Sequence, residues 1–556
     1  MSEEAAKRSG NRRLSGEVFT VISRTFSGMP SFNGEVDEKN MSSPSHLGQA
    51  RQDRLTLGKI SIWLAGVVLL LGRAPVALPQ FPESSSLLLL PAASWAFGSS
   101  LATLDPSGQS QSSVPRKLPA LRVAENRRFL ITADGKPFFW LGDTAWQLIH
   151  DLREEELRRY FADRRNKGFN VILTVVLVEL RFDQPNAYGH FPIEKGRPDR
   201  PIVEPGPDND YWDDVERVLR LAEEHELYIG LLPTWGKWVT SDWQSGIVDG
   251  FFNVENAEQY GRFLGARFKD YNNMIIWILG GDKAAPTDEA RGVWRALARG
   301  IALGVAGRED YSQVLMTYHT SGPGSTHWFF NKEPWLDIHG VHSSHGRWAL
   351  NWILVTHAYT MKPTLPVIDL ETTYPEFRHG WPPTEATDDD ARRAAYWAVF
   401  AGAAGHTYGH HSIWQMHSPR YPGVARPKRF WYEALDAPSA HQMGYLRRLI
   451  ESKPFLTQRP DLPLLAFEQS KPWEMCLALR GEGYVMVYTP MGHPLVIAMD
   501  KVGFEQIQAS WFDPRTGRVT EIGRFSNVGR QNFVPPGKPA EGNDWVLLLE
   551  ASGKAP

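Results

Sequence analysis

The chain has 556 residues, a length that predicts roughly two to four domains. Hydrophobic residues make up 42% and charged residues 22%, the balance of a globular protein with a core, and the formal net charge of −3 excludes an electrostatic basis for binding nucleic acid. Cys476 is the single cysteine, which excludes a disulfide framework and a thiolate zinc site. The 21 tryptophans fit a carbohydrate site, because aromatic rings stack on the apolar faces of sugars, although most are expected in the core.

The first 120 residues lack the pattern of a folded domain. Residues 1–55 are polar and show no periodicity, which predicts a disordered extension. Residues 56–98 contain an apolar run at 60–72 that follows Arg51, Arg54 and Lys59, as the h-region of an export signal follows its basic n-region. Residues 99–120 are rich in Ser, Gln and Pro, which is typical of a linker.

The apolar run has more than one interpretation. It is short for a membrane-spanning helix, which needs about 20 residues, and residues 94–96 form a small-x-small sequence that suits signal cleavage. We therefore expect a secreted, periplasmic or membrane-anchored protein that faces away from the cytoplasm. In the anchored case, a tethering helix would extend through residues 60–78. A surface amphipathic segment is disfavoured because the run has no polar face.

From about residue 121, short apolar runs alternate with amphipathic helical stretches, the pattern of βαβ units. Eight strands are expected, at residues 138–142, 170–176, 227–232, 274–279, 314–318, 336–341, 366–370 and 406–414. Helices are expected between them, among others at 153–166, 212–225, 257–271 and 392–404. Eight strands with intervening helices over about 300 residues predict an α/β fold, a (β/α)8 TIM barrel, for residues 121–453.

The pattern changes again near Pro454. Short alternating runs such as 484–490 and 494–500 follow one another without long helices, and turn sequences such as 513–517 separate them. This spacing predicts a small all-β sandwich for residues 454–556.

Two carboxyl groups stand where a barrel places its active site, directly after predicted strands. Asp282 follows the fourth strand and Glu371 ends the seventh, and the strand ends form the catalytic face of a barrel. Cleavage of a glycosidic bond needs two carboxyl groups that flank it, and in retaining barrels they commonly follow strands four and seven. A capping or salt-bridging role is the alternative for each of them.

Other polar and aromatic residues also follow the strands. Asp143 is expected either to bind a sugar hydroxyl or to cap the first helix. The remaining predicted substrate-binding residues are Trp146, Trp235, His319, His342, Tyr374 and Tyr408. For His319 and His342, ordinary hydrogen-bonded histidines are the alternative.

The histidines also raise the possibility of a metal site. Hydrolytic zinc barrels usually carry a His-x-His pair after the first strand, where this chain has Gly142 and Asp143. His410 and His411 are adjacent, and neighbours in an extended strand point to opposite faces. We therefore expect no metal ligands and no cofactor.

Three sequences together resemble the apiosidase-like family of glycoside hydrolases: FFWLGDTAW at 138–146, WILGGD at 277–282 and VIDLETTYPEF at 367–377. The resemblance covers roughly residues 121–450, and the residues from 455 to 550 are similar to a β-sandwich named for collagen binding that often follows the barrel in that family. The best-described activity of the family is release of apiose from pectin side chains with retention of configuration.

The resemblance also implies roles. It places Asp282 at the acid/base position and Glu371 at the nucleophile position. In the wider clan of such barrels an Asn precedes the acid/base and contacts the sugar 2-hydroxyl, whereas Gly281 precedes Asp282 here. Another group is therefore expected to contact that hydroxyl.

The sequence thus predicts a retaining, exo-acting glycosidase that acts on side chains of plant or bacterial polysaccharides without a cofactor. One alternative is a carbohydrate-binding or adhesion protein that keeps the barrel and lacks activity. The other is a metal-dependent hydrolase.

Overall fold

The computed structural model describes residues 117–240, 251–380 and 383–552. The predicted extension (1–55), the signal or anchor segment (56–98) and nearly all of the linker (99–120) lie outside these residues. Within the described part of the chain, no helix is both long and apolar enough to cross a membrane.

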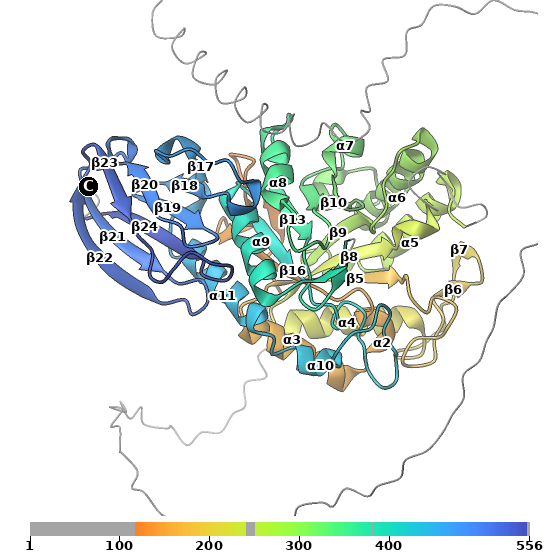
Figure 1. Cartoon of the computed structure of the whole chain (residues 1–556). Helices are drawn as coiled ribbons and strands as arrows, with labels where there is room; N and C mark the ends of the chain where they lie inside the picture. Colours follow the sequence, from red (N-terminus) through yellow and green to blue (C-terminus); the bar gives the residue numbers. More distant parts are fainter. Residues whose placement is uncertain (1–116, 241–250, 381–382, 553–556) are drawn as a thin grey trace, which may run out of the picture. The chain divides into compact units, whose positions relative to one another are not determined.

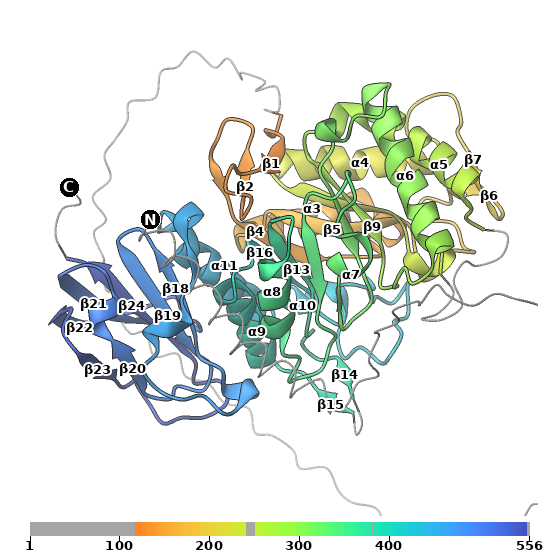
Figure 2. The same ribbon diagram turned by 90° about the horizontal axis from the view of Figure 1, so that it is seen from above.

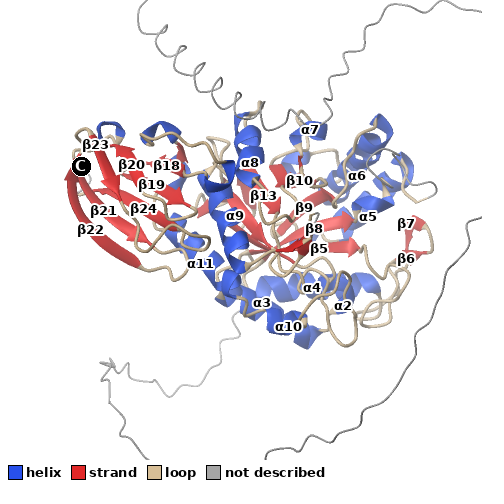
Figure 3. Ribbon diagram, in the orientation of Figure 1, coloured by secondary structure: helices blue, strands red, loops and turns tan. Residues whose placement is uncertain are grey.

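The larger, N-terminal domain of the described residues is a barrel-like sheet surrounded by helices (Figures 1 and 3). Eight strands run parallel in the order β10-β9-β8-β5-β4-β16-β13-β12, and β11 (Gly324–Ser325) adds an antiparallel edge to β12. The parallel strands are β4 (Trp140–Thr144), β5 (Val171–Leu177), β8 (Tyr228–Thr234), β9 (Ile275–Gly280), β10 (Met316–His319), β12 (His339–His342), β13 (Val367–Glu371) and β16 (Gly405–Tyr408). The eight strands and the TIM-barrel class predicted from the sequence are confirmed.

No ladder joins β10 to β12 in the described residues, but the two strands lie close together. Asp337 N donates to Met316 O over 3.0 Å, and Thr317 Oγ1 donates to Ile338 O over 2.8 Å. These bonds bring the two ends of the sheet together, so the barrel is nearly closed.

Helices cover the outside of the sheet, as the view in Figure 2 also shows. They include α3 (Glu154–Asn166), α4 (Tyr211–Glu224), α5 (Val254–Arg267), α6 (Asp288–Ala306), α8 (Asn351–Thr360), α9 (Asp388–Phe400) and α11 (Pro438–Glu451). Their starts follow the sequence: Asp210, for example, caps α4 by accepting bonds from the backbone of Trp212 and Asp213.

Two details differ from the sequence prediction. A small antiparallel sheet of β1 (Leu121–Val123), β2 (Leu130–Thr132) and β3 (Pro137–Phe138) precedes the barrel. Strand β16 ends at Tyr408, well before the expected end at residue 414, because the chain turns: Ile413 N donates to His410 O over 2.9 Å.

The C-terminal domain is all-β, as expected. One sheet has the order β17 (Arg459–Pro460), β18 (Leu477–Gly481), β19 (Tyr484–Thr489), β24 (Trp545–Ala551), β21 (Gln506–Phe512) and β22 (Val519–Ser526). A second sheet pairs β20 (Leu495–Ala498) with β23 (Arg530–Phe533). Buried side chains from both sheets, including Val487, Ile497 and Leu547, form the core between them.

A buried ion pair joins this domain to the barrel. Arg392 of α9 lies 2.6 Å from an Asp544 carboxylate oxygen, and both side chains are at most 2% exposed. Tyr396 of α9 stacks on Tyr488 of β19 at a centroid distance of 5.0 Å. Burial of a charge is costly unless a partner compensates it, so the two domains depend on each other at this contact.

Candidate active site

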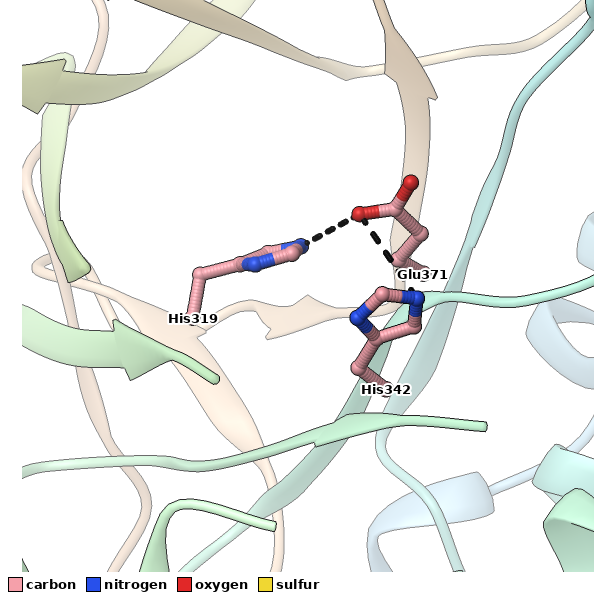
Figure 4. Close-up of side chains that lie close together, drawn as sticks. All are labelled: His319, His342 and Glu371. Atoms are coloured by element: carbon pink, nitrogen blue, oxygen red, sulfur yellow. Dashed lines mark ion pairs between the residues drawn. The ribbon is translucent and has the colours of Figure 1, made fainter. Parts of the chain in front are cut away.

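Glu371 lies at the carboxyl end of β13, and its side chain is only 5% exposed. The Tyr374 hydroxyl donates to Glu371 Oε1 over 2.6 Å. Two histidines approach the other carboxylate oxygen: His319 Nε2 lies 2.9 Å and His342 Nε2 lies 4.0 Å from Oε2 (Figure 4). His345 Nε2 lies 3.4 Å from Oε1. Glu371 is therefore a buried carboxylate that accepts a hydrogen bond from Tyr374 and has three histidine side chains within 4.0 Å.

These neighbours determine the charge of Glu371. Burial alone would raise its pKa, but His342, His319 and His345 outweigh burial and hold the pKa well below its usual range. Burial also raises the pKa of Tyr374, so its hydroxyl remains a donor. Glu371 is thus kept as an anion.

The backbone fixes the proton on His319. Asp282 N–H donates to His319 Nδ1 over 3.1 Å. A ring nitrogen that accepts a bond carries no hydrogen, so the neutral imidazole carries its proton on Nε2. That nitrogen is the one that faces Glu371, and His319 is therefore set to donate toward the carboxylate.

His342 and His345 have the opposite arrangement. His342 Nδ1 lies 3.1 Å from the carbonyl oxygen of Thr320, and His345 Nδ1 lies 2.8 Å from that of Thr372. A carbonyl oxygen only accepts, so both rings carry a proton on Nδ1. Burial lowers the pKa of both histidines, and the negative charge of Glu371 opposes this. When either ring is neutral, its Nε2 is an acceptor that faces the site. A sugar hydroxyl can donate the hydrogen bond that these Nε2 atoms would accept.

Asp282 follows β9 in a turn whose first two residues are glycines in backbone conformations that favour glycine. Gly280, Gly281 and Asp282 have successive positive φ angles of 91°, 128° and 52°. A Cβ on Gly280 would lie 2.2 Å from the carbonyl oxygen of His319. The two glycines therefore let the end of β9 lie against β10, which brings the Asp282 amide to His319.

The carboxyl group of Asp282 has a different environment from that of Glu371. Its side chain is 46% exposed at the open end of the barrel, and Oδ1 lies 3.4 Å from His342 Nδ1. Desolvation by the surrounding protein, followed by the negative charge of Glu371, raises the pKa of Asp282 to about 6. The two carboxyl groups thus lie near the same imidazole, yet Glu371 favours the ionised form, whereas Asp282 keeps its proton up to a pH of about 6.

Two tryptophans complete one wall of this group. Trp146 follows β4 and Trp235 follows β8, and their rings lie 5.3 Å apart. Trp146 also lies 5.4 Å from the ring of His319. The structure therefore brings together seven of the nine residues predicted from the sequence: Asp282, Glu371, Trp146, Trp235, His319, His342 and Tyr374.

The other two, Asp143 and Tyr408, point toward the outer helices. Asp143 is fully buried, accepts a 2.6 Å bond from the Tyr160 hydroxyl and lies 3.3 Å from Arg164 of α3. Tyr408, its register partner on β16, reaches Ser439 of α11 over 3.0 Å. Side chains alternate along a strand, and Gly142 and Thr407 occupy the interior face. Neither side chain faces the interior of the barrel, as the predicted sugar-binding role requires, and Asp143 does not cap the following helix, whose N-cap is Gln147.

Sequence reasoning left out three residues that the structure places at the site. His345 contacts Glu371, as described above. Glu179 follows β5 by two residues and lies close enough to Asp282 for that charge to raise its pKa, after burial and against Lys237. A Cβ on Gly409 would lie 2.1 Å from the Tyr374 ring. The sequence itself indicated His345 and Glu179, because both are polar residues shortly after predicted strands.

One group of three could also hold a metal ion. His319, His342 and Glu371 each offer one ligand atom, and these atoms lie within 4.8 Å of one another. The protonation of His319 opposes this use, because its Nε2 carries the hydrogen and has no free lone pair. The set fits a hydrogen-bonded carboxylate better than a metal centre.

Comparison with known proteins gives two family matches. Residues 124–457 match the family model described as "Apiosidase-like, catalytic domain". Residues 460–550 match the model described as "Putative collagen-binding domain of a collagenase". No curated protein sequence matches the chain.

Solved structures agree with the first match. One, described as a glycoside hydrolase, is 34% identical with a TM-score of 0.72, over 79% of this chain and 98% of its own. Another, a glycoside hydrolase family 5 protein from Bacteroides vulgatus ATCC 8482, is 31% identical with a TM-score of 0.71, over 78% and 94%.

Proposed function

Because this chain belongs to the apiosidase-like family of glycoside hydrolases, we propose that it is a retaining, exo-acting enzyme that removes terminal sugars from polysaccharide side chains. One observation carries the mechanism: Glu371 is held ionised while the pKa of Asp282 is raised to about 6. Two carboxyl groups with opposite protonation are what general acid and nucleophilic catalysis require.

The reaction then proceeds in two steps. Asp282 donates its proton to the glycosidic oxygen as Glu371 attacks the anomeric carbon, so the C–O bond to the leaving group breaks and a glycosyl ester forms. The Asp282 carboxylate next takes a proton from water, whose oxygen attacks the anomeric carbon and displaces Glu371. Two inversions give net retention.

The histidines would bind the glycone. His342 Nε2 is buried and has no hydrogen-bond partner among the described residues. We assign it to accept a bond from a sugar hydroxyl, in the place of the missing Asn before Asp282. The exo mode is supported by the burial of Glu371, Trp146 and Trp235, which suits the end of a glycan chain better than its middle. The family makes terminal apiose the first sugar to test.

The experiment is a screen of the full chain against pectic and bacterial polysaccharides, with NMR to identify the released sugar and its first-formed anomer. Release of one monosaccharide with the configuration of the substrate supports the proposal, and Glu371→Gln is the inactive control. An inverted first product would assign Glu371 as a base for water. Binding without hydrolysis would favour the carbohydrate-binding alternative, and activity lost to EDTA and restored by zinc would favour the metal-dependent one.

A polymeric substrate also bears on location. We propose that the enzyme acts outside the cytoplasm, where such polysaccharides occur, and the apolar run at 60–72 supports this. Fractionation of the native host should recover the protein in the medium or the envelope. Full-length protein in the soluble cytoplasm would contradict the proposal.

A further inference from the structure

Glu179 is a carboxylate at the site that the mechanism above does not use. It follows β5 and is partly buried. Among the described residues, no hydrogen bond and no ion pair reaches its carboxylate, although Lys237 Nζ donates to its backbone oxygen over 2.7 Å. A partly buried carboxylate without a hydrogen-bond partner is costly unless a ligand satisfies it.

Two lysines, Lys237 and Lys283, lie on the turns beside Asp282, and their charges lower the pKa of Glu179 against burial. Lys237 lies in the short turn after β8 (Gly236–Trp238), and Gly236 N donates to Gly281 O over 3.0 Å. Lys283 follows Asp282, and a Cβ on Gly236 would lie 2.8 Å from the Cβ of Lys283. The turn that carries Lys237 therefore packs against the turn that carries the acid.

An aromatic wall stands beside the same turn. Phe182 and Trp238 are half-buried, with ring centroids 4.5 Å apart. Lys237 Nζ lies 4.8 Å from the centre of the Trp238 ring. The Trp238 indole nitrogen donates to the backbone oxygen of Val178 over 3.1 Å. This bond holds the ring against the residue that precedes Glu179.

We propose that Glu179, Lys237 and Lys283, with the Phe182–Trp238 wall, form a subsite for the sugar ring that the leaving oxygen carries. The inference rests on the proposed function, in which Asp282 touches that oxygen, so groups beyond Asp282 meet the leaving group. Each sugar hydroxyl both donates and accepts a hydrogen bond. A carboxylate accepts and an ammonium group donates, so Glu179 and the two lysines together offer partners for both capacities of neighbouring hydroxyls.

The substrate class follows. The leaving group is a further sugar, so the enzyme prefers an oligosaccharide or polysaccharide to an aryl or alkyl glycoside. This preference arises from binding of the leaving group, and the roles of Asp282 and Glu371 are the same for both kinds of substrate.

The first test measures binding without turnover. In the full chain with Glu371→Gln, affinity is measured by calorimetry for a set of pectic and bacterial cell-wall oligosaccharides. Adding Glu179→Gln or Lys237→Met should weaken binding of the best ligand about tenfold or more, since hydrogen bonds to charged groups are involved. Glu468→Gln, on the exposed surface of the sandwich, is the matched control and should bind as the parent does. No bound oligosaccharide, or unchanged affinity in both site variants, would overturn the subsite.

The second test separates this subsite from the catalytic pair. For the sugar released in the screen, kcat/KM is compared between an oligosaccharide and the 4-nitrophenyl glycoside. Glu179→Gln should lose about tenfold more on the oligosaccharide, whereas an equal loss on both substrates would overturn the inference and leave the proposed function standing. Conversely, Glu179-dependent binding in a chain that hydrolyses nothing would refute the proposed function and with it the leaving-group assignment, and would leave Glu179 as part of a carbohydrate-binding site.

Discussion

Gly409 provides a sharp test of how Glu371 is held in place. It follows β16, and a Cβ at this position would lie 2.1 Å from Cε1 and 2.6 Å from Cζ of Tyr374. Because ordinary contact begins at 3.4 Å, the ring must move by about 1.3 Å in Gly409→Ala. The Tyr374 hydroxyl bond to Glu371, now 2.6 Å long, would then be lost.

The size of the effect follows from that bond. A hydrogen bond to a charged group contributes about 1.5–3 kcal/mol, so kcat/KM should fall by about 10- to 150-fold. The lost donor had favoured the ionised form of Glu371, so its pKa should rise and the acidic limb of the pH–rate profile should move to higher pH. Overpacking should also lower the free energy of unfolding by about 1–3 kcal/mol.

Steady-state kinetics from pH 4 to 9 and urea unfolding measure these effects. Tyr374→Phe removes the hydroxyl without the overlap, so it should reproduce the kinetic loss without most of the loss in stability. Gly292→Ala is the control, since a Cβ there meets only Val254 at 3.6 Å. Full activity in Gly409→Ala, or kinetic losses that add fully in the double variant with Tyr374→Phe, would refute the reasoning.

Three further predictions concern the acid, the nucleophile and the domain contact. Asp282 must be protonated to act, so kcat/KM should fall as pH rises through its pKa of about 6; in Asp282→Asn this basic limb should vanish, and a limb that persists would remove Asp282 from the acid role. Glu371→Gly should lose nearly all activity, and azide should restore turnover with a glycosyl azide of inverted configuration; an azide product of retained configuration would exclude Glu371 as the nucleophile. Arg392→Met leaves Asp544 buried without its partner and should lower the free energy of unfolding by about 3–5 kcal/mol, whereas Arg308→Met, 73% exposed, should change it little; equal effects in urea unfolding would contradict this account.

The fold could be predicted from the sequence because several of its strands are buried, largely apolar runs. Every residue of β5 and β8 is buried, and such runs between amphipathic helices have few alternatives to a parallel barrel. Strand ends were harder to predict. The run at 406–414 looked like one strand, but its second half turns back on itself after Gly409.

The site could be predicted only as far as strand position determines it. Asp282 and Glu371 follow strands, and so does Asp143, yet Asp143 faces α3 and pairs with Arg164. A shift of one residue along a strand decides whether a side chain faces the interior or the helices. In a strand buried on both faces, the apolar pattern does not reveal this shift. Glu179 was missed although it is a polar residue shortly after β5, the same kind of signal that identified the residues after the other strands.

The chemical states of the side chains depend on backbone groups that no motif displays. His319, His342 and His345 are the same residue type around one carboxylate, and their roles differ because an amide faces the Nδ1 of the first and carbonyls face the Nδ1 of the other two. The amide belongs to Asp282 and reaches His319 only because Gly280 and Gly281 permit the turn. The sequence Gly-Gly-Asp therefore does two things at once. It presents the acid at the mouth of the site, and through His319 it places a proton against Glu371, so the residues that position one carboxyl group also help to keep the other one charged.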